Sequence, residues 1–590
     1  MFGSRTRSGS RGRLNLKTRL FLLLFLLVCV VFHPVVHGEF LFWDDDINIS
    51  QNPHLNGLGW QQLKWIFTGT DYLGRYQPLA WLSWSVIKQC FGLNPFWFHL
   101  VNLLFHAANA GLVFLLVRKL LLAAQMTGET APAHLSIAAA LAAALWATHP
   151  MRVETTAWTV ELVFVQPLFL FLLALLCYLR SADAGSGRSG PFYWASVALF
   201  TASLVSFPIA LGGCVVFIAF DIYPLRRLSV DPWRWLTPAA RRVWLEKLPF
   251  VATALFFGWF NLHVRAHPST AWSHLTTLEV FSPAARVMQA FYMWAYYVWR
   301  PWWPVHLTPV PTQLMDFKPF DAPFVLSAIL VLGLSGWLFC QRRRWPGLFV
   351  IWFCHLGLLV PMLGLSEHPH YPSDRYSMTV GICWAVLLGG GFAKWWPQVR
   401  ARQILQVGTA VLLALLSVMS YRQTFLWQTN VGFFTQLLAG WKEGPVFLPR
   451  RVDLYMHLAR AHSQRGEFSD AIDNLQAAVR LAPEYPEARI RLGDALMAAG
   501  QLDAARASYE AAARLDPKFS PPLNDLGVAF AQQGKLDRAI EQFSEVLRND
   551  SSNRSALQNI ATALQHLGRT NEAEVYLAKL NGLPARAPNH

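Results

Sequence analysis

Residues 20–36 read LFLLLFLLVCVVFHPVV, an apolar run of nearly the length that a helix needs to cross a bilayer. Basic residues crowd the segment before it. A charged start and an apolar core also fit a signal peptide, but no small-x-small cleavage site follows, and many further apolar runs do. We therefore predict an uncleaved first transmembrane helix behind a basic N-terminus (residues 1–19), whose charges are Arg5, Arg7, Arg11, Arg13, Lys17 and Arg19.

The composition of the whole chain agrees with a membrane protein. Of its 590 residues, 54% are hydrophobic and only 14% are charged, whereas a soluble domain averages about 25% charged residues. We predict an all-α, polytopic membrane domain over residues 20–421. Its eleven expected spans lie near 20–37, 98–117, 134–149, 162–179, 192–207, 208–223, 248–264, 324–340, 347–365, 376–393 and 404–421.

The apolar segment 284–303 decides the predicted topology, because counting it as a twelfth span would move everything after it across the membrane. With eleven spans, 22 of the 34 basic residues in 1–450 fall in short cytoplasmic segments, as the positive-inside rule favours. We therefore predict an interfacial helix at 284–303. The N-terminus is then cytoplasmic and the C-terminal region extracytoplasmic, in the periplasm of a bacterium or the ER lumen of a eukaryote.

The C-terminal region repeats itself every 34 residues. A period of 34 with Leu-Gly pairs at Leu492-Gly493 and Leu526-Gly527 is typical of tetratricopeptide repeats (TPRs), in which small residues let two antiparallel helices pack closely. We predict about four such repeats over residues 450–590, after a linker at 422–449. Two positions carry the period, namely a glycine (Gly466, Gly500, Gly534 and Gly568) and an alanine (Ala471, Ala505, Ala539 and Ala573).

The positive net charge of the chain does not indicate a nucleic-acid partner. Residues 451–590 carry 16 basic and 17 acidic side chains, so the excess lies among the apolar segments. Such charge is typical of membrane topology rather than of RNA binding. We expect a protein or peptide acceptor as the partner of the repeats and a membrane around the first domain.

The first predicted outer loop, residues 38–97, begins with three consecutive carboxylates, Asp44, Asp45 and Asp46. Carboxylates this close repel one another unless a cation or a proton-bearing substrate is near. They indicate either a site that activates an acceptor or a solvated negative cap on the helix that follows. Because no second set of ligands accompanies them, the need for a divalent metal stays open.

Further polar residues gather at other helix ends on the same predicted side. His99, Asn102 and His106 share one helical face, where interhelical hydrogen bonds and substrate contact are both plausible. Two more clusters are His149 with Arg152 and Glu154, and Asp374 with Arg375. Arginine suits an anionic oxygen through bidentate hydrogen bonds, so Arg75, Arg152 and Arg375 are candidates for holding a phosphate.

These motifs, taken together, resemble the transmembrane-and-TPR protein O-mannosyltransferases and their bacterial relatives. The resemblance covers nearly the whole chain and ends in TPRs. It rests on the order of short motifs, namely Asp44-Asp45, Asn52-Pro53, Tyr76-Gln77-Pro78-Leu79, Gly92-Leu93-Asn94-Pro95, His99-Leu100-Val101-Asn102, His106, His149-Pro150, Glu154, Asp221-Ile222-Tyr223-Pro224-Leu225, Glu246-Lys247-Leu248-Pro249-Phe250 and Asp374-Arg375-Tyr376.

The resemblance implies a C-type glycosyltransferase fold. An acidic residue of the first outer loop would serve a hydroxyl acceptor, and the donor would be a polyprenyl-phosphate sugar, typically mannose. Asp44 and Asp45 are then the catalytic candidates, with Asp46 less favoured because alignment on Asn52 selects the first pair. The candidates for substrate binding are Arg75, His99, His149, Arg152, Glu154, Asp374 and Arg375.

The chain departs from the family where a phosphate would need positive charge. Family members tend to carry Arg at the position of Gln77, and the bacterial relatives Lys at that of Phe207. The segment 159–164 likewise lacks the arginine usual after the His-Pro motif. A membrane-anchored TPR scaffold without catalysis is therefore an alternative function. A transporter of lipid-linked saccharides is a third, although no inverted repeat stands out.

Overall fold

The computed structural model is entirely helical over the residues it describes. The chain divides into two compact units, Met1–Gly432 and Phe433–His590. No strand occurs among the described residues, which confirms the predicted all-α class. The described residues are 14–583 without 71, 125–131, 184–189, 268–275, 313, 316–317, 367–369, 442–443, 445–447 and 517–520.

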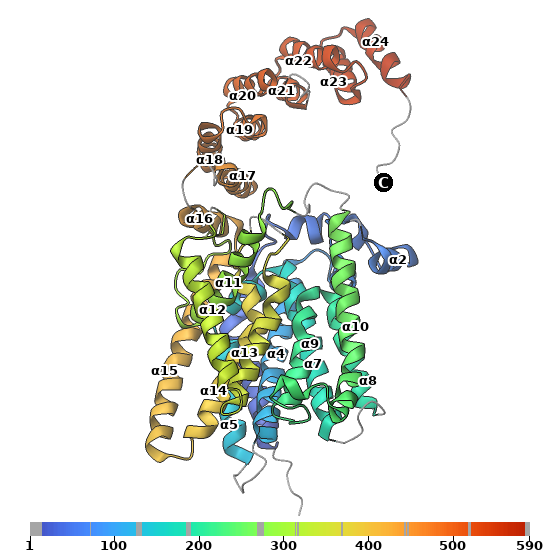
Figure 1. Cartoon of the computed structure of the whole chain (residues 1–590). Helices are drawn as coiled ribbons and strands as arrows, with labels where there is room; N and C mark the ends of the chain where they lie inside the picture. Colours follow the sequence, from blue (N-terminus) through green and yellow to red (C-terminus); the bar gives the residue numbers. More distant parts are fainter. Residues whose placement is uncertain are drawn as a thin grey trace, which may run out of the picture. The chain divides into compact units, whose positions relative to one another are not determined.

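The first unit contains one apolar helical segment for each of the eleven predicted spans. Within the described part of the chain, 7 helical segments are long and apolar enough to cross a membrane, and four more are apolar but shorter. They run side by side in Figure 1. Their helices are α1 (Leu16–Phe32), α4 (Pro95–Ala124), α5 (Pro132–Ala147), α7 (Leu162–Asp183), α8 (Pro191–Ser206), α9 (Cys214–Ile222), α10 (Pro238–Ala266), α12 (Ala322–Cys340), α13 (Pro346–Leu359), α14 (Ser377–Trp395) and α15 (Val399–Thr424).

The ambiguous segment forms helix α11 (Pro283–Trp299), which packs against α12 and α13. It is not among the apolar helices of the described residues that could span a membrane by length and composition. Proline in the chain just after it, at Pro301 and Pro304, stops regular helix because proline lacks a backbone N–H. The side of the membrane on which α11 lies stays a prediction.

Short elements connect the long helices at the end where the candidate residues gather. Proline opens several of them, because its fixed φ suits the first helical turn. These elements are η1 (His33–His37), η2 (Asp46–Ser50), η3 (Pro53–Leu55), α2 (Trp60–Thr68), α3 (Pro78–Phe91), η4 (Pro150–Arg152), α6 (Val153–Ala157), η5 (Thr159–Glu161), η10 (Val360–Met362), η11 (Asp374–Tyr376) and η12 (Phe425–Trp427). The remaining short elements of this unit are η7 (Pro208–Gly213), η8 (Pro232–Arg234) and η9 (Arg300–Trp302).

The second unit begins within α16 (Asn430–Gly440) and consists mainly of four stacked helix pairs (Figure 1). Each pair turns at a glycine in the left-handed region, for example Gly500 at φ +77°, where L side chains are strained. The alanines of the repeat are fully buried, as close helix packing requires. The helices are α17 (Leu448–Gln464), α18 (Phe468–Leu481), α19 (Pro486–Ala498), α20 (Leu502–Leu515), α21 (Pro521–Gln532), α22 (Leu536–Asn549), α23 (Arg554–His566) and α24 (Thr570–Asn581).

Candidate functional site

Asp45 connects the first outer loop to the segment before α7 by a hydrogen bond. One carboxylate oxygen of Asp45 accepts a hydrogen bond from the backbone N–H of Leu41, and the other accepts one from Val160, both at 2.9 Å. Asp45 is 0% exposed, so it is not part of a solvated negative cap. Burial raises the pKa of Asp45 to about 7, and the neighbouring charge of Asp44 adds to the effect. Asp44 itself is only half-buried.

A second connection joins the segment before α7 to the turn before α14. Glu154 accepts hydrogen bonds from the backbone N–H of Arg375 at 3.0 Å and from its Nη1 at 2.7 Å. Glu161 places a second carboxylate 3.4 Å from the same nitrogen. Burial raises the pKa of Glu154, and the charge of Arg375 opposes this. Arg375 therefore links Glu154 of α6 and Glu161 of η5, two acidic side chains from the segment before α7.

The guanidinium of Arg375 is also surrounded by aromatic rings. Its carbon lies 5.6 Å from the ring centre of Trp158 and 5.9 Å from that of Phe164, within the range of cation–π attraction. The side chain keeps 21% of its surface exposed. Among the described residues, hydrogen-bond and ion-pair partners are found at Nη1 only, so Nη2 and Nε form an open edge without such a partner there.

Arg75 and Arg152 differ in what they offer to an anion. Arg75 is half-buried, its charge acts on Glu161, and its guanidinium makes no hydrogen bond or ion pair with another described residue. Arg152 is buried and donates to the carbonyl of Trp146 at 3.2 Å and to Ser377 Oγ at 2.6 Å. Burial lowers the pKa of Arg152 to about 9, which Asp374 partly offsets. Arg152 thus fastens α5 to α14 rather than facing the loop.

The polar face of α4 is used for contacts within the protein. The side-chain amide of Asn102 donates to the carbonyls of Trp158 and Thr159 at 2.8 and 3.2 Å. His106 Nε2 lies 3.0 Å from the carbonyl of Ala147. Of the two readings left open by the sequence, interhelical hydrogen bonding therefore describes Asn102 and His106.

His99, on the same face, is buried against the start of the outer loop. Gly38 approaches it so closely that a Cβ there would lie 2.8 Å from Nε2 of His99. His149 is equally enclosed: its Nε2 lies 2.9 Å from the carbonyl of Pro301, and its Nδ1 accepts from the N–H of Met151. His149 therefore supports the loop backbone, whereas both ring nitrogens of His99 have no hydrogen-bond partner among the described residues.

No group of three or more metal-ligating side chains was found near the outer loop, as far as the described residues go. The group that does occur among them lies in the first repeat, where His462, Glu467 and Asp470 have ligand atoms within 4.8 Å of one another. The question of a divalent metal at the outer loop, left open by the sequence, therefore gains no candidate ligand set from the described residues.

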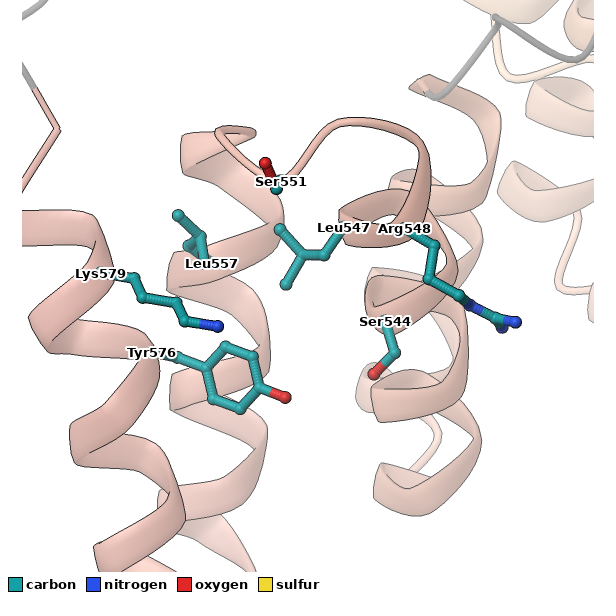
Figure 2. A pocket seen from close by; sticks show the side chains of 7 residues that line it. All are labelled: Ser544, Leu547, Arg548, Ser551, Leu557, Tyr576 and Lys579. Atoms are coloured by element: carbon teal, nitrogen blue, oxygen red, sulfur yellow. The ribbon is translucent and has the colours of Figure 1, made fainter.

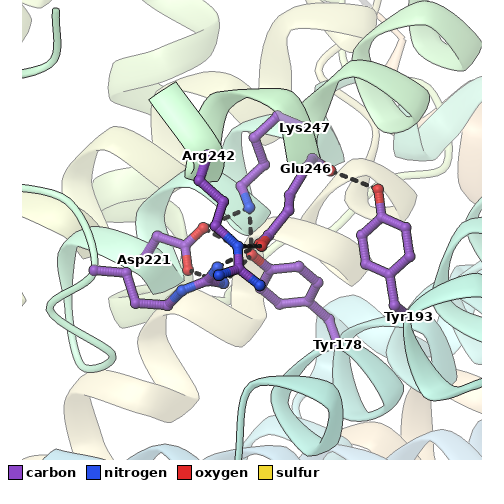
Figure 3. Close-up of polar contacts among 7 residues, drawn as sticks. Tyr178, Tyr193, Asp221, Arg242, Glu246 and Lys247 are labelled. Atoms are coloured by element: carbon purple, nitrogen blue, oxygen red, sulfur yellow. Dashed lines mark hydrogen bonds and ion pairs between the residues drawn. The ribbon is translucent and has the colours of Figure 1, made fainter. Parts of the chain in front are cut away.

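Two other motifs of the sequence meet at the far end of α7. Asp221, from the end of α9, accepts from Tyr178 at 2.7 Å and lies 2.5 Å from Lys247 Nζ on α10 (Figure 3). Arg227 pairs with both Asp221 and Glu246. Glu161 directly precedes α7 and Tyr178 lies 17 residues further along the chain, a rise of about 25 Å, so this cluster joins helices rather than serving the candidate site.

Glu161 and Gln77 were not among the predicted site residues. Glu161 is buried with one carboxylate oxygen, Oε2, that finds no hydrogen-bond partner among the described residues, and both polar atoms of the buried Gln77 side chain share this property. The signal for Glu161 was present in the sequence, because a carboxylate directly before a long apolar run is costly to bury without a function.

The raised pKa of Asp45 predicts a pH-dependent contribution to stability. The pKa of this carboxyl group is higher in the folded chain than its ordinary value of 3.8 in the unfolded chain. Its contribution to the stability of the fold is therefore complete below pH 3.8 and is lost as the pH rises toward 7. Asp45→Asn does not titrate. We therefore expect the variant to melt below the wild type, with a larger gap at pH 5 than at pH 8. A gap that stays constant over this range in detergent-solubilised protein would contradict the assignment.

The fold and the site together define a polytopic helical membrane protein that ends in a TPR unit. A family model described as tetratricopeptide repeat matches residues 457–518 and 524–585. Crystal structures of MamA cover 26% of this chain and 85% of their own at 24% identity, with a TM-score of 0.23, which supports no further argument.

Named relatives cover the membrane unit as well. The chain is 23% identical over 526 residues to human "Protein O-mannosyl-transferase TMTC1", covering 79% of this chain and 55% of that protein. To "Protein O-mannosyl-transferase Tmtc3" of Drosophila melanogaster it is 23% identical, covering 71% and 50%. The chain spans about half the length of these curated relatives. The similarity confirms the resemblance to the transmembrane-and-TPR protein O-mannosyltransferases that the motifs predicted.

Proposed function

We propose that this chain is a membrane glycosyltransferase that transfers a sugar, mannose in the first instance, from a polyprenyl-phosphate carrier to a hydroxyl group of a protein. The names of its relatives support the reaction class. The observation that carries the proposal is the meeting of the first outer loop with the Glu154–Arg375–Glu161 cluster through Asp45. Carboxylates for an acceptor thereby lie close to arginines for a phosphate.

In this proposal Asp44 is the general base. It takes the proton of the acceptor hydroxyl as that oxygen bonds to C1 of the sugar, while the bond from C1 to the phosphate oxygen breaks. The electron pair leaves with the lipid phosphate. Asp45, with both oxygens engaged by backbone N–H groups, positions the loop that carries Asp44.

The open edge of Arg375 and the guanidinium of Arg75 hold the departing phosphate. Arginine stabilises the negative charge that develops on the leaving oxygen, and such fixed charges supply much of the catalysis in group transfer. Glu154 and the aromatic rings fix the plane of Arg375, so that its remaining donors are pre-oriented. Arg152 has no role in this proposal, because its Nε and Nη1 donate to Trp146 and Ser377 inside the protein.

The function is tested by a transfer assay on purified full-length protein with a panel of polyprenyl-phosphate sugars, with and without chelator. Turnover that requires a lipid-linked sugar and leaves the sugar on a hydroxyl acceptor supports the proposal. Binding of acceptor with no turnover from any donor would favour the scaffold alternative instead. Loss of turnover on chelation would add a metal to the site.

Arg75→Ala is expected to raise the KM for the lipid-linked donor about 10- to 100-fold, the effect of losing one charge-assisted hydrogen bond. The melting temperature should hardly change, since Arg75 makes no ion pair with a described residue. Lys64→Ala, which removes an exposed cation of α2 in the same loop, is the matched control and should leave the KM unchanged. An unaltered donor KM in Arg75→Ala would remove this residue from the site.

The predicted topology places the outer loop and the TPR unit on the non-cytoplasmic side. An alkaline phosphatase fused after the last residue should therefore be active, because the enzyme folds only outside the cytoplasm, and a fluorescent protein that needs the cytosol should stay dark at the same position. The reverse pattern would mean that 284–303 crosses the membrane.

A further inference from the structure

An open pocket of about 360 Å³ lies between the last two repeats, where α22, α23 and α24 meet (Figure 2). Leu547 and Leu557 form an apolar part of its wall. Tyr576 and Lys579 project into it from α24, and Ser544 faces them from α22. The volume lies within the range of binding sites for one or two amino-acid side chains or a small ligand.

The pocket offers donors that keep no hydrogen-bond or ion-pair partner, although the ammonium of Lys579 lies 5.7 Å from the ring centre of Tyr576. Within the described part of the repeats, the ammonium of Lys579 and the hydroxyls of Ser544, Ser551 and Tyr576 make no hydrogen bond or ion pair. Arg548 also lines the pocket, but its guanidinium turns away toward Glu545, with which it pairs. No carboxylate lines the pocket, so its net charge is positive.

The sequence of the repeat differs between this junction and the one before it. One period of 34 residues earlier, the position of Lys579 is held by Glu545 and that of Ser544 by Glu510. The junction before therefore offers two carboxylates where this one offers an ammonium and a hydroxyl. Packing between helices does not require the change, since Lys579 is exposed. A change of sign at an exposed position with an open pocket points to an anionic ligand.

We propose that this pocket binds a carboxylate group of a polypeptide, with an adjacent apolar side chain against Leu547 and Leu557. Lys579 pairs with the carboxylate, and the hydroxyls of Tyr576 and Ser544, which face it, donate hydrogen bonds to its oxygens. The inference deepens the proposed function. It rests on that function in one respect, namely that the bound polypeptide is the acceptor. Binding is measured without transfer, so either idea can fail alone.

The test uses full-length protein in detergent and fluorescein-labelled peptides. One pair carries an internal Leu-Asp-Leu or Leu-Asn-Leu with both ends blocked, and a second pair ends in Leu-Leu as a free carboxylate or as an amide. The pairs distinguish a side-chain carboxylate from a chain end. We expect at least one carboxylate peptide to bind about 10-fold or more tightly than its neutral partner.

Lys579→Glu, which introduces the residue type found one repeat earlier, should abolish this preference. Lys535→Glu changes another exposed lysine of the same unit and should retain it. Equal binding of charged and neutral peptides, or a preference that survives Lys579→Glu, would overturn the proposal. Inorganic phosphate that binds more tightly than either carboxylate peptide would also overturn it, in favour of a phosphate ligand.

Discussion

Asp44→Asn is expected to lower sugar transfer by about 10²- to 10⁴-fold, the range that follows the loss of a general base. Asparagine keeps the size of the side chain but cannot accept the acceptor's proton. The side chain is half-buried beside the Glu161–Arg375 cluster, on which its charge acts. The measurement is the initial rate of transfer from a saturating lipid-linked donor, with KM for both substrates.

Two neighbouring carboxylates provide the controls. Asp46→Asn alters a side chain that already accepts from the N–H of Ile47 at 2.9 Å, so transfer should change by only a few fold. Asp45→Asn should lower stability, because an amide nitrogen cannot accept the N–H of Leu41 or Val160. Near-wild-type turnover in Asp44→Asn would exclude it as the base, and full activity in all three variants would mean that the general base lies outside this group of carboxylates.

The fold could be read from the sequence because its signals are periodic and redundant. Each predicted span coincides with an apolar helix, and the 34-residue period fixes the turns of the repeats at glycines with positive φ. Neither signal depends on distant contacts. The apolar length of a span and the small residues of a TPR are properties of the local sequence.

The site could be predicted only as a set of segments. The predicted topology put Asp44, Glu154 and Arg375 on the same side of the membrane. It did not predict the role of each residue. Asp45 and Asp44 are adjacent and chemically identical, yet only the packing against Val160 decides which of them is buried. Likewise Arg152 and Arg375 look equivalent in sequence, and Ser377 engages the first while Glu154 engages the second.

Phe207, one of the positions at which the chain departs from the family, lies near Arg375. Its ring lies 5.5 Å from that of Phe164, which in turn contacts the guanidinium of Arg375. The position at which the resemblance leads us to expect lysine in bacterial relatives therefore lies next to a ring that contacts Arg375. The cation–π contacts with Trp158 and Phe164 orient the guanidinium of Arg375 but add no positive charge.

The cluster at the far end of α7 predicts the largest loss of stability. Lys247→Met is expected to destabilise the membrane unit by about 3–5 kcal/mol, because it leaves the buried Asp221 short of a counter-charge. In this variant the remaining ion-pair partner of Asp221 among the described residues is Arg227, which also pairs with Glu246. The readout is the temperature at which half of the detergent-solubilised protein is lost from the monodisperse peak.

The comparison with an exposed pair tests the cause of this loss. Lys119 pairs with Asp183 at the same end of α7, but both side chains are partly exposed, so Lys119→Met should cost less than about 1 kcal/mol. Asp221→Leu combined with Lys247→Met removes both buried charges and should recover much of the stability, since a buried ion pair can be replaced by apolar side chains of similar volume. A double variant no better than Lys247→Met would mean that packing around Tyr178, rather than the unpaired charge, sets the cost. Because the cluster lies about 25 Å from Glu161, the protein that stays folded should transfer sugar at the wild-type rate.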